Sequence, residues 1–348
     1  MRNFLFLLPL FTLFSAQAQI YKPTGRPVPA PLVNILTPAD QKYLALMEDT
    51  LHRLSNLFTM DTVLENRKKA CYSFIPKLVQ ALKTPNSFYF PFDSFETISK
   101  VYPPDSTFRI LTWQLYTTVP VNIPAKYSKT GRDTFFEKPY IRYYGVIQMR
   151  SRELTMFPLF DAGDTLAYGT QQVLGPNNWW GQLYYNIIQK TVKGKNYYTL
   201  FGYEAVDQLA RRKIIDVLTF SEDKKPKFGA PLFYFKYTDT AAIKERDTLS
   251  RFFIEYKWNA TTHLNYDPSL EMIVFDHVAP PSDKAKGATF TYVPDGTYEG
   301  FVWAADHWNW VEKVFTYAIN KNDAPPIPVP LFGPTQNQTV NPGEESPH

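Results

Sequence analysis

The chain has 348 residues, a formal net charge of +4 and a single cysteine. This length allows one large domain or two smaller ones with a full hydrophobic core, and the lone Cys71 excludes an internal disulfide. The small positive excess gives no basis for nucleic acid binding. Aromatic residues make up 16% of the chain, which is typical of strands that carry rings on both faces.

The N-terminus has the pattern of a signal peptide over residues 1–18. Arg2 supplies a positive charge, residues 4–14 form a short apolar run, and Ala16-Gln17-Ala18 matches a signal peptidase site. We therefore expect a mature chain that starts at Gln19 and is periplasmic, outer-membrane-associated or extracellular. The run is too short to span a membrane, and no later stretch approaches the ~20 apolar residues required.

The next segments differ sharply in pattern. Residues 19–36 hold four prolines without periodicity, which predicts an extended leader. Residues 37–84 predict a helical hairpin. Its first helix covers 38–58 with Thr37 as the N-cap, and its second begins at Thr62, whose spacing to Glu65 fits a capping box. Pro76 is expected to kink the second helix.

Residues 85–320 change to an alternating pattern, which predicts an antiparallel β domain. Lys193 to Asn196 predicts the clearest hairpin turn, and Val293 to Gly296 a second turn inside a hairpin over 289–303. Residues 154–160 contain Pro158 and are placed on an edge. The other expected strands are 108–116, 140–149, 184–192, 197–203, 213–220, 231–237, 251–258, 270–278 and 308–317. Residues 321–348 are predicted to be disordered.

Large residues on both strand faces require a sheet that is covered twice. In the strand 108–116, Phe108 and Ile110 alternate with Leu111 and Trp113. The expected fold is therefore mainly β, either an antiparallel sandwich or a curled barrel-like sheet, preceded by the helical hairpin.

No local motif of a hydrolase is present, neither a G-x-S-x-G elbow nor H-E-x-x-H. Glu204, Asp207 and Glu255 are the carboxylates considered for a glycosidase pair, which requires two carboxyl groups facing each other across a cleft. His263, His277 and His307 are the histidines considered for metal binding. We expect structural roles for all of these groups, a buried unreactive Cys71 and no cofactor.

Two adjacent tryptophans follow a loop rich in amides and suggest a sugar-binding platform. Indole faces stack on sugar rings while amides bind hydroxyls, so Trp179, Trp180, Asn177 and Asn178 are candidate ligand-binding residues. The alternative is that the tryptophans pack in the core and at a sheet edge.

Asp-Thr or Asp-Ser followed by a small or apolar residue recurs along the chain, beginning at Asp49, Asp61, Asp105, Asp164, Asp239 and Asp247. The pattern resembles the O-glycosylation signal of exported Bacteroidota proteins, which makes Thr165, Thr240 and Thr248 candidate glycosylation sites. Helix caps and turns are the alternative explanation.

Residues 197–233 and 292–314, together with FRILTWQLY and YYGVIQ upstream, resemble a group of exported Bacteroidota proteins without an assigned activity. The resemblance covers most of residues 88–317 and transfers no catalytic residue. We therefore expect a non-enzymatic binding or envelope-assembly component, with a glycan or an envelope protein as its partner. The alternative is a carbohydrate-binding or carbohydrate-active protein, and the sequence leaves the oligomeric state open.

Overall fold

The computed structural model describes residues 35–166, 170–235 and 247–315. The described residues up to 314 form one compact unit by their contacts. Residues 19–34 of the expected leader, the tail at 321–348 and Thr240 lie outside the described residues. The fold is mainly β with antiparallel sheets and an N-terminal pair of helices, as the sequence predicts.

The pair of helices consists of α1 (Pro38–Met60) and α2 (Leu64–Leu82). Thr37 caps α1 as expected, because its hydroxyl accepts the Asp40 amide at 3.1 Å. The predicted capping box at Thr62 is wrong. Val63 is the N-cap residue of α2 and makes no side-chain cap. The Asp61 carboxylate instead accepts the Val63 amide at 2.7 Å, which fixes the turn between the helices.

The first sheet has the order β1-β2-β3-β4 and is antiparallel throughout. Its strands are β1 (Ser99–Val101), β2 (Phe108–Ile123), β3 (Thr134–Met149) and β4 (Met156–Phe160). The edge position of β4 confirms the prediction made from Pro158. Both long strands extend well beyond their predicted limits.

The second sheet has the order β11-β7-β6-β5, with β8 paired to β7. The predicted β5–β6 hairpin is confirmed with a tighter turn, since only Lys193 and Gly194 lie between the strands, and both have positive φ. The strands are β5 (Leu183–Val192), β6 (Lys195–Glu204), β7 (Ala210–Phe220), β8 (Pro226–Phe228) and β11 (Phe252–Lys257).

The third sheet has the order β10-β9-β15-β14-β13-β12, and its β15–β9 pair is parallel. The predicted hairpin over 289–303 is wrong. Val293 to Gly296 belong to one long strand, β14, which pairs with β13 on both sides of a bulge. Residues 289–291 form a 3-10 turn instead. The strands are β9 (Phe233–Phe235), β10 (Asp247–Leu249), β12 (Leu264–Asp267), β13 (Met272–Ala279), β14 (Val293–Ala304) and β15 (His307–Val311).

The helices and the three sheets pack as layers, and an apolar core lies between each two neighbouring layers. The first lies between the helices and the first sheet, where Phe74 meets Trp113. The second joins the first and second sheets, with Phe108 against Tyr198. The third joins the second and third sheets around Phe301. The second sheet is thus covered on both faces, and no described sheet closes on itself.

Short 3-10 helices connect the elements at η1 (Ser87–Tyr89), η2 (Ala125–Tyr127), η3 (Gly163–Thr165), η4 (Pro176–Asn178), η5 (Asp283–Ala285) and η6 (Thr289–Thr291). None of the helices in the described ranges combines the length and apolar character needed to cross a membrane.

Candidate functional site

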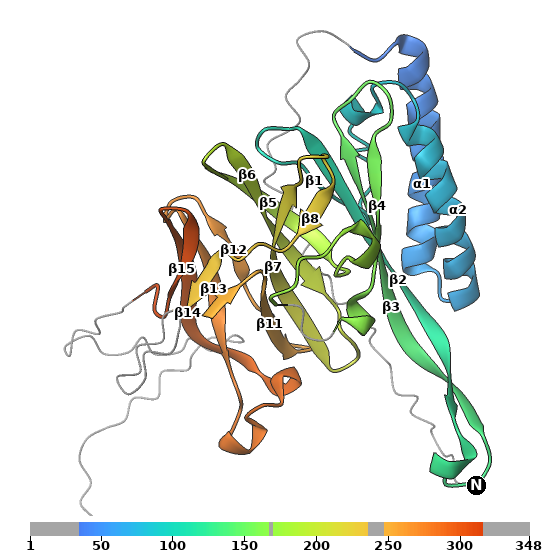
Figure 1. Cartoon of the computed structure of the whole chain (residues 1–348). Helices are drawn as coiled ribbons and strands as arrows, with labels where there is room; N and C mark the ends of the chain where they lie inside the picture. The colour runs from blue at the N-terminus through green and yellow to red at the C-terminus, as the bar shows by residue number, and fades with distance from the viewer. Residues whose placement is uncertain (1–34, 167–169, 236–246, 316–348) are drawn as a thin grey trace, which may run out of the picture. The chain divides into compact units, whose positions relative to one another are not determined.

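The distal halves of β2 and β3 form a two-stranded ribbon, here called the arm (residues 117–140). The two strands pair without interruption from Phe108 and Met149 to Ile123 and Thr134. β1 pairs β2 only up to Thr112, and β4 pairs β3 only from Tyr144. Beyond these points no other strand of the described residues joins the ladder, and Figure 1 shows β2 and β3 leading away from β4.

The arm exposes large aromatic side chains. Tyr127 at its tip is 72% exposed, and Phe135 and Phe136 on β3 are 70% and 45% exposed. Single exposed apolar residues are common on protein surfaces, but three aromatic rings on one narrow segment form a concentration typical of interaction sites. The arm is thus the strongest candidate for an interface in the described structure.

The rings emerge on both faces of the arm. Phe136 lies opposite Val121. Both are on the same face of the sheet as Leu111 and Trp113, which pack against the helices. Phe135 lies opposite Asn122 on the other face. A partner that contacts both rings must therefore enclose the ribbon rather than lie flat on one side.

The arm also carries an excess of positive charge. Its four cations are Lys126, Lys129, Arg132 and Lys138, against the carboxylates of Asp133 and Glu137. Asp133 is engaged in the turn, where it accepts the Ala125 amide at 2.8 Å. Between residues 117 and 140, all of them described, no cation forms an ion pair. Lys126 lies 4.6 Å from the centroid of the Tyr127 ring, and the charges of Lys129, Arg132 and Lys138 are available to a partner.

Sequence reasoning did not identify the arm, because Pro120 and Pro139 interrupt the strand pattern. The available signal was the pair Phe135-Phe136. Adjacent residues on a strand point to opposite faces, so two neighbouring rings outside a covered sheet leave at least one exposed.

The two tryptophans of the expected sugar platform are buried. Trp179 is 0% exposed and donates its indole N–H to the Tyr184 hydroxyl at 2.7 Å. Trp180 is 6% exposed and donates to Glu204 at 3.1 Å. These side chains pack in the core between the first and second sheets, so they do not form an exposed stacking surface.

The amide residues before the tryptophans are exposed and serve the loop. Asn178 accepts the Gly175 amide at 2.7 Å, which closes the turn η4. Asn177 is also exposed. The structure therefore separates the exposed amides from the buried rings that the sequence places beside them.

Two of the three considered carboxylates come together around one arginine. Arg212 donates to Glu204 at 2.8 Å and to Glu255 at 2.6 Å, and all three side chains are at most 23% exposed. Burial raises the pKa of Glu204, and the charge of Arg212 opposes this shift. Asp207 lies elsewhere, accepting the Leu209 and Ala210 amides in a turn.

The arrangement around Arg212 satisfies charges rather than opening a cleft. The guanidinium lies over the Trp180 and Phe253 rings, 5.6 and 5.3 Å from their centroids. Both carboxylates are therefore held by a cation and aromatic packing, which is a geometry for stability rather than for proton transfer to a substrate.

The considered histidines have separate partners. His277 interacts with Asp295 at 2.7 Å, and His307 contacts Asp306 at 2.8 Å and Asn309 at 3.0 Å. Within the described ranges, no three His, Cys, Asp or Glu side chains converge in a way that could hold a metal ion. His307 follows the hairpin turn between β14 and β15, where Ala305 has positive φ.

Thr165 is exposed in η3, and its hydroxyl donates to the Ala162 carbonyl at 2.9 Å. Thr248 is half-buried and lies in β10, where it pairs with Tyr234.

Cys71 is fully buried between the helices and the first sheet, and burial raises the pKa of its thiol to about 11.

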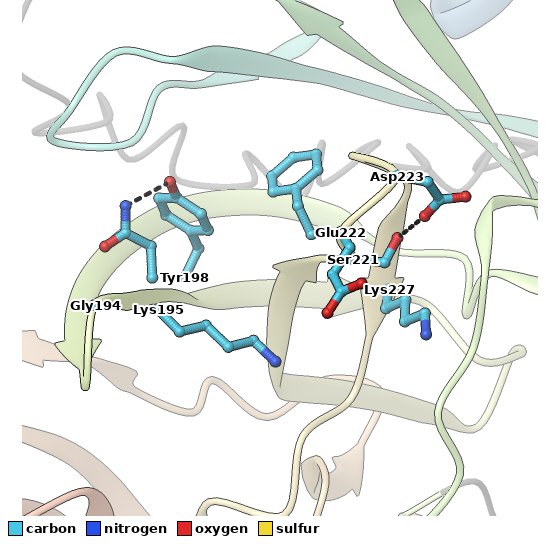
Figure 2. A pocket seen from close by; sticks show the side chains of 9 residues that line it. Gly194, Lys195, Tyr198, Ser221, Glu222, Asp223 and Lys227 are labelled. Atoms are coloured by element: carbon cyan, nitrogen blue, oxygen red, sulfur yellow. Dashed lines mark hydrogen bonds between the residues drawn. The ribbon is translucent and has the colours of Figure 1, made fainter.

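A hollow of about 860 Å³ lies between the β5–β6 turn and the β7–β8 turn. Figure 2 shows the Lys195 side chain extending from the first turn toward the second, which carries Glu222 and Asp223. Tyr198 contributes its ring and is hydrogen bonded to Asn196. The hollow thus combines ammonium, carboxylate, amide and aromatic groups.

A scan of the chain against models of protein families finds no match, and a search of curated proteins finds no relative.

Proposed function

We propose that this chain is an exported, non-enzymatic binding component of the cell envelope that engages a protein partner through the arm. The single observation that carries the proposal is the exposure of Tyr127, Phe135 and Phe136 on a ribbon that no other described strand supports. Aromatic side chains are enriched among the residues that contribute most binding energy at protein interfaces.

The stability of a two-stranded ribbon supports the same proposal. Isolated hairpins are marginally stable in water because they bury little apolar surface. A partner that encloses Phe135 and Phe136 would supply the missing burial. The cations on the arm favour a partner whose apolar pocket is bordered by carboxylates.

Site-specific photo-crosslinking tests this proposal. A photoreactive residue at Phe135 is expected to give one discrete crosslinked partner in native envelopes, competed away by excess purified protein. The triple variant Tyr127→Ser, Phe135→Ser, Phe136→Ser is expected not to compete.

A photoreactive residue at Leu46, which is 60% exposed on α1, is the matched control. The proposal is contradicted if both positions give the same crosslinked species, or if the triple variant competes as well as the wild-type chain. With the purified partner, added salt is expected to weaken binding, because the cations on the arm contribute.

Export is part of this proposal and is supported by Arg2, the apolar run over 4–14 and the site at Ala16-Gln17-Ala18. N-terminal sequencing of the protein from envelope fractions is expected to begin at Gln19. A protein that retains Met1 and stays in the cytosol would contradict export.

O-glycosylation of Thr165 and Thr248 also remains a proposal, with Thr240 outside the described residues. It is supported by the recurring Asp-Thr pattern and by the exposure of Thr165. The intact mass of the native protein is expected to exceed that of the bare mature chain. An intact mass equal to the bare chain would contradict modification.

Carbohydrate binding is a second candidate function, supported by the hollow in Figure 2 rather than by Trp179 and Trp180. Its Asn196 amide and its Lys195 and Lys227 ammonium groups can contact an acidic sugar. Calorimetric titration with acidic polysaccharides is expected to show saturable binding that Lys195→Ala weakens. Equal binding by wild-type and Lys195→Ala chains would contradict it.

A further inference from the structure

Helix α1 carries a second apolar stripe that does not face the core. Leu44, Leu51 and Phe58 point into the core between the helices and the first sheet. Apolar side chains on another side of the helix stay exposed, with Leu46 at 60% and Met60 at 69%. The stripe consists of Tyr43, Leu46, Thr50, Arg53, Leu57 and Met60, which alternate spacings of three and four residues. This spacing keeps them on one side of the helix, as in a coiled-coil seam.

Contacts on other sides of α1 fix the rotation of the helix about its axis. The Glu48 carboxylate accepts the Ser94 amide at 2.7 Å, and the His52 ring nitrogen lies 2.6 Å from the Ser94 carbonyl oxygen. Figure 1 shows α2 lying alongside α1. With the core, the loop and α2 on its other sides, α1 presents the stripe outward.

The stripe is apolar at both ends and polar in the middle. Thr50 and Arg53 occupy the middle, and Asp49 borders it. Within residues 35–166, 170–235 and 247–315, neither Asp49 nor Arg53 belongs to an ion pair. Two apolar segments with an acid and a base between them form a pattern that is similar in both directions along the helix.

A second copy of α1 running in the opposite direction complements the stripe. One register places Leu46 beside Leu57 of the second copy. The same register places Tyr43 beside Met60, because both pairs are centred on the same point of the stripe. Each pair occurs twice around a two-fold axis, so the four apolar side chains of both copies leave water together.

The charges favour this antiparallel direction. In the same register, Arg53 of each copy lies beside Thr50 and next to Asp49 of the other copy, which allows two symmetric ion pairs at the centre. A parallel pair would instead place Arg53 beside Arg53, and like charges in contact repel each other. The charge complementarity therefore points to a second copy of this chain, in reverse direction, as the occupant of the stripe.

We propose that two copies of this chain associate through α1, packed antiparallel, to form a closed dimer around a two-fold axis. The contact uses the stripe on α1 and does not rest on the partner proposed for the arm. A single pair of helices buries less surface than a standard protein interface, so the expected dissociation constant is micromolar.

Disulfide trapping tests the register. The single variants Leu46→Cys and Leu57→Cys are expected to form a mixed disulfide when combined, and no disulfide when each is oxidised alone. Two copies of Leu46 would lie about 16 Å apart along the antiparallel pair, which is too far for a disulfide. The native Cys71 is buried and does not compete. Self-disulfides of either single variant, or the absence of the mixed disulfide, would overturn the proposal.

Sedimentation equilibrium of the purified full chain tests the surface. The wild-type chain is expected to be dimeric at micromolar concentration. Leu46→Asp is expected to raise the dissociation constant about tenfold or more, because an apolar contact is lost. Ala45→Asp, at an exposed neighbour outside the stripe, is the matched control and is expected to have little effect. A monomeric wild-type chain, or equal effects of the two variants, would contradict the proposal.

A charge exchange and a crosslink separate a second copy from other occupants. Arg53→Glu is expected to weaken the dimer, and adding Asp49→Lys is expected to restore it. A double variant as weak as Arg53→Glu would refute the antiparallel register. A photoreactive residue at Leu46 is expected to capture α1 of a second copy. Capture of residues 19–34 of the same chain, or of another protein, would assign the stripe to that occupant and overturn the proposal.

Discussion

Trp180 and Glu204 are joined by a hydrogen bond of 3.1 Å from the indole N–H to the carboxylate. The same carboxylate receives Arg212 at 2.8 Å, so the ring, the acid and the base hold one another in place. The indole edge is thereby fixed inside the molecule, and the carboxylate has no remaining role as an exposed acid. This unit ties the segment after η4 to β6 and β7 in the second sheet.

Replacing Trp179 by alanine is expected to destabilise the chain by about 3–5 kcal/mol, because the ring is fully buried and its loss leaves a cavity. Urea unfolding followed by circular dichroism measures the effect. Asn177→Ala, an exposed neighbour, is expected to change stability by less than about 0.5 kcal/mol. Similar losses for both variants would show that Trp179 is not a core residue.

Arg212→Met is expected to lower the free energy of unfolding by about 3 kcal/mol. This value is near the lower end of the losses measured when one partner of a buried ion pair is removed, because 18% of the Arg212 side chain is exposed. The loss leaves Glu204 and Glu255 without their cation. Adding Glu204→Gln and Glu255→Gln is expected to restore most of the stability in a denaturant titration. A triple variant as unstable as Arg212→Met would refute electrostatic pairing as the cause.

Gly202→Ala is expected to destabilise the chain by about 1–3 kcal/mol, since the added carbon would lie 1.8 Å from the buried Gln182 Oε1. Gly175→Ala is the control, because the nearest atom to its added carbon is 3.6 Å away. Thermal unfolding of both variants compares them. Equal melting temperatures would show that the side chain of Gln182 moves aside freely.

Lys213 is expected to make stability rise with pH. Burial lowers its folded pKa to about 8, so between pH 8 and about 10.4 the unfolded chain binds more protons than the folded chain. Lys213→Met is expected to remove this rise. It is also expected to increase the free energy of unfolding by roughly 2 kcal/mol at pH 7, a value reduced to allow for the residual solvent contact of the side chain. Unfolding free energies at pH 7, 8 and 9.5 measure it, and an unchanged slope in the variant would contradict it.

Cys71 is expected to resist thiol reagents in the folded chain. The side chain is fully buried, and its raised pKa of about 11 keeps the thiol protonated at neutral pH. Reaction with a chromogenic disulfide is expected to be slow in buffer and complete in urea. Fast reaction of the native protein would show that the core around Phe74 opens readily.

The hydrophobic pattern predicts most of the framework. The stripe through Leu44, Leu51 and Phe58 places α1, and the alternation around Tyr184 and Tyr198 places the β5–β6 hairpin. These elements are decided by local periodicity and turn chemistry, so a single sequence suffices to find them. The same reasoning locates the edge strand β4 from Pro158.

Other features depend on distant partners. The Val293 to Gly296 stretch has turn chemistry, yet β13 pairs with both sides of it and keeps it inside one strand. Thr62 has cap spacing, but Val63 is the N-cap residue and the Asp61 carboxylate accepts the Val63 amide. The convergence of Glu204 and Glu255 on Arg212 arises from three strands meeting, which spacing along the chain does not encode.

In the third sheet, β9 depends for its place on β15, a strand that comes more than 70 residues later in the chain. β9 is joined to the rest of that sheet through its parallel pairing with β15, the last strand described. Trp308 on β15 is fully buried in the core that also contains Phe201 and Ile215 of the second sheet. A chain that stops at residue 304 would lack β15, so β9 would lose its pairing with this strand and the core would lose Trp308, which would leave apolar side chains open to aggregation.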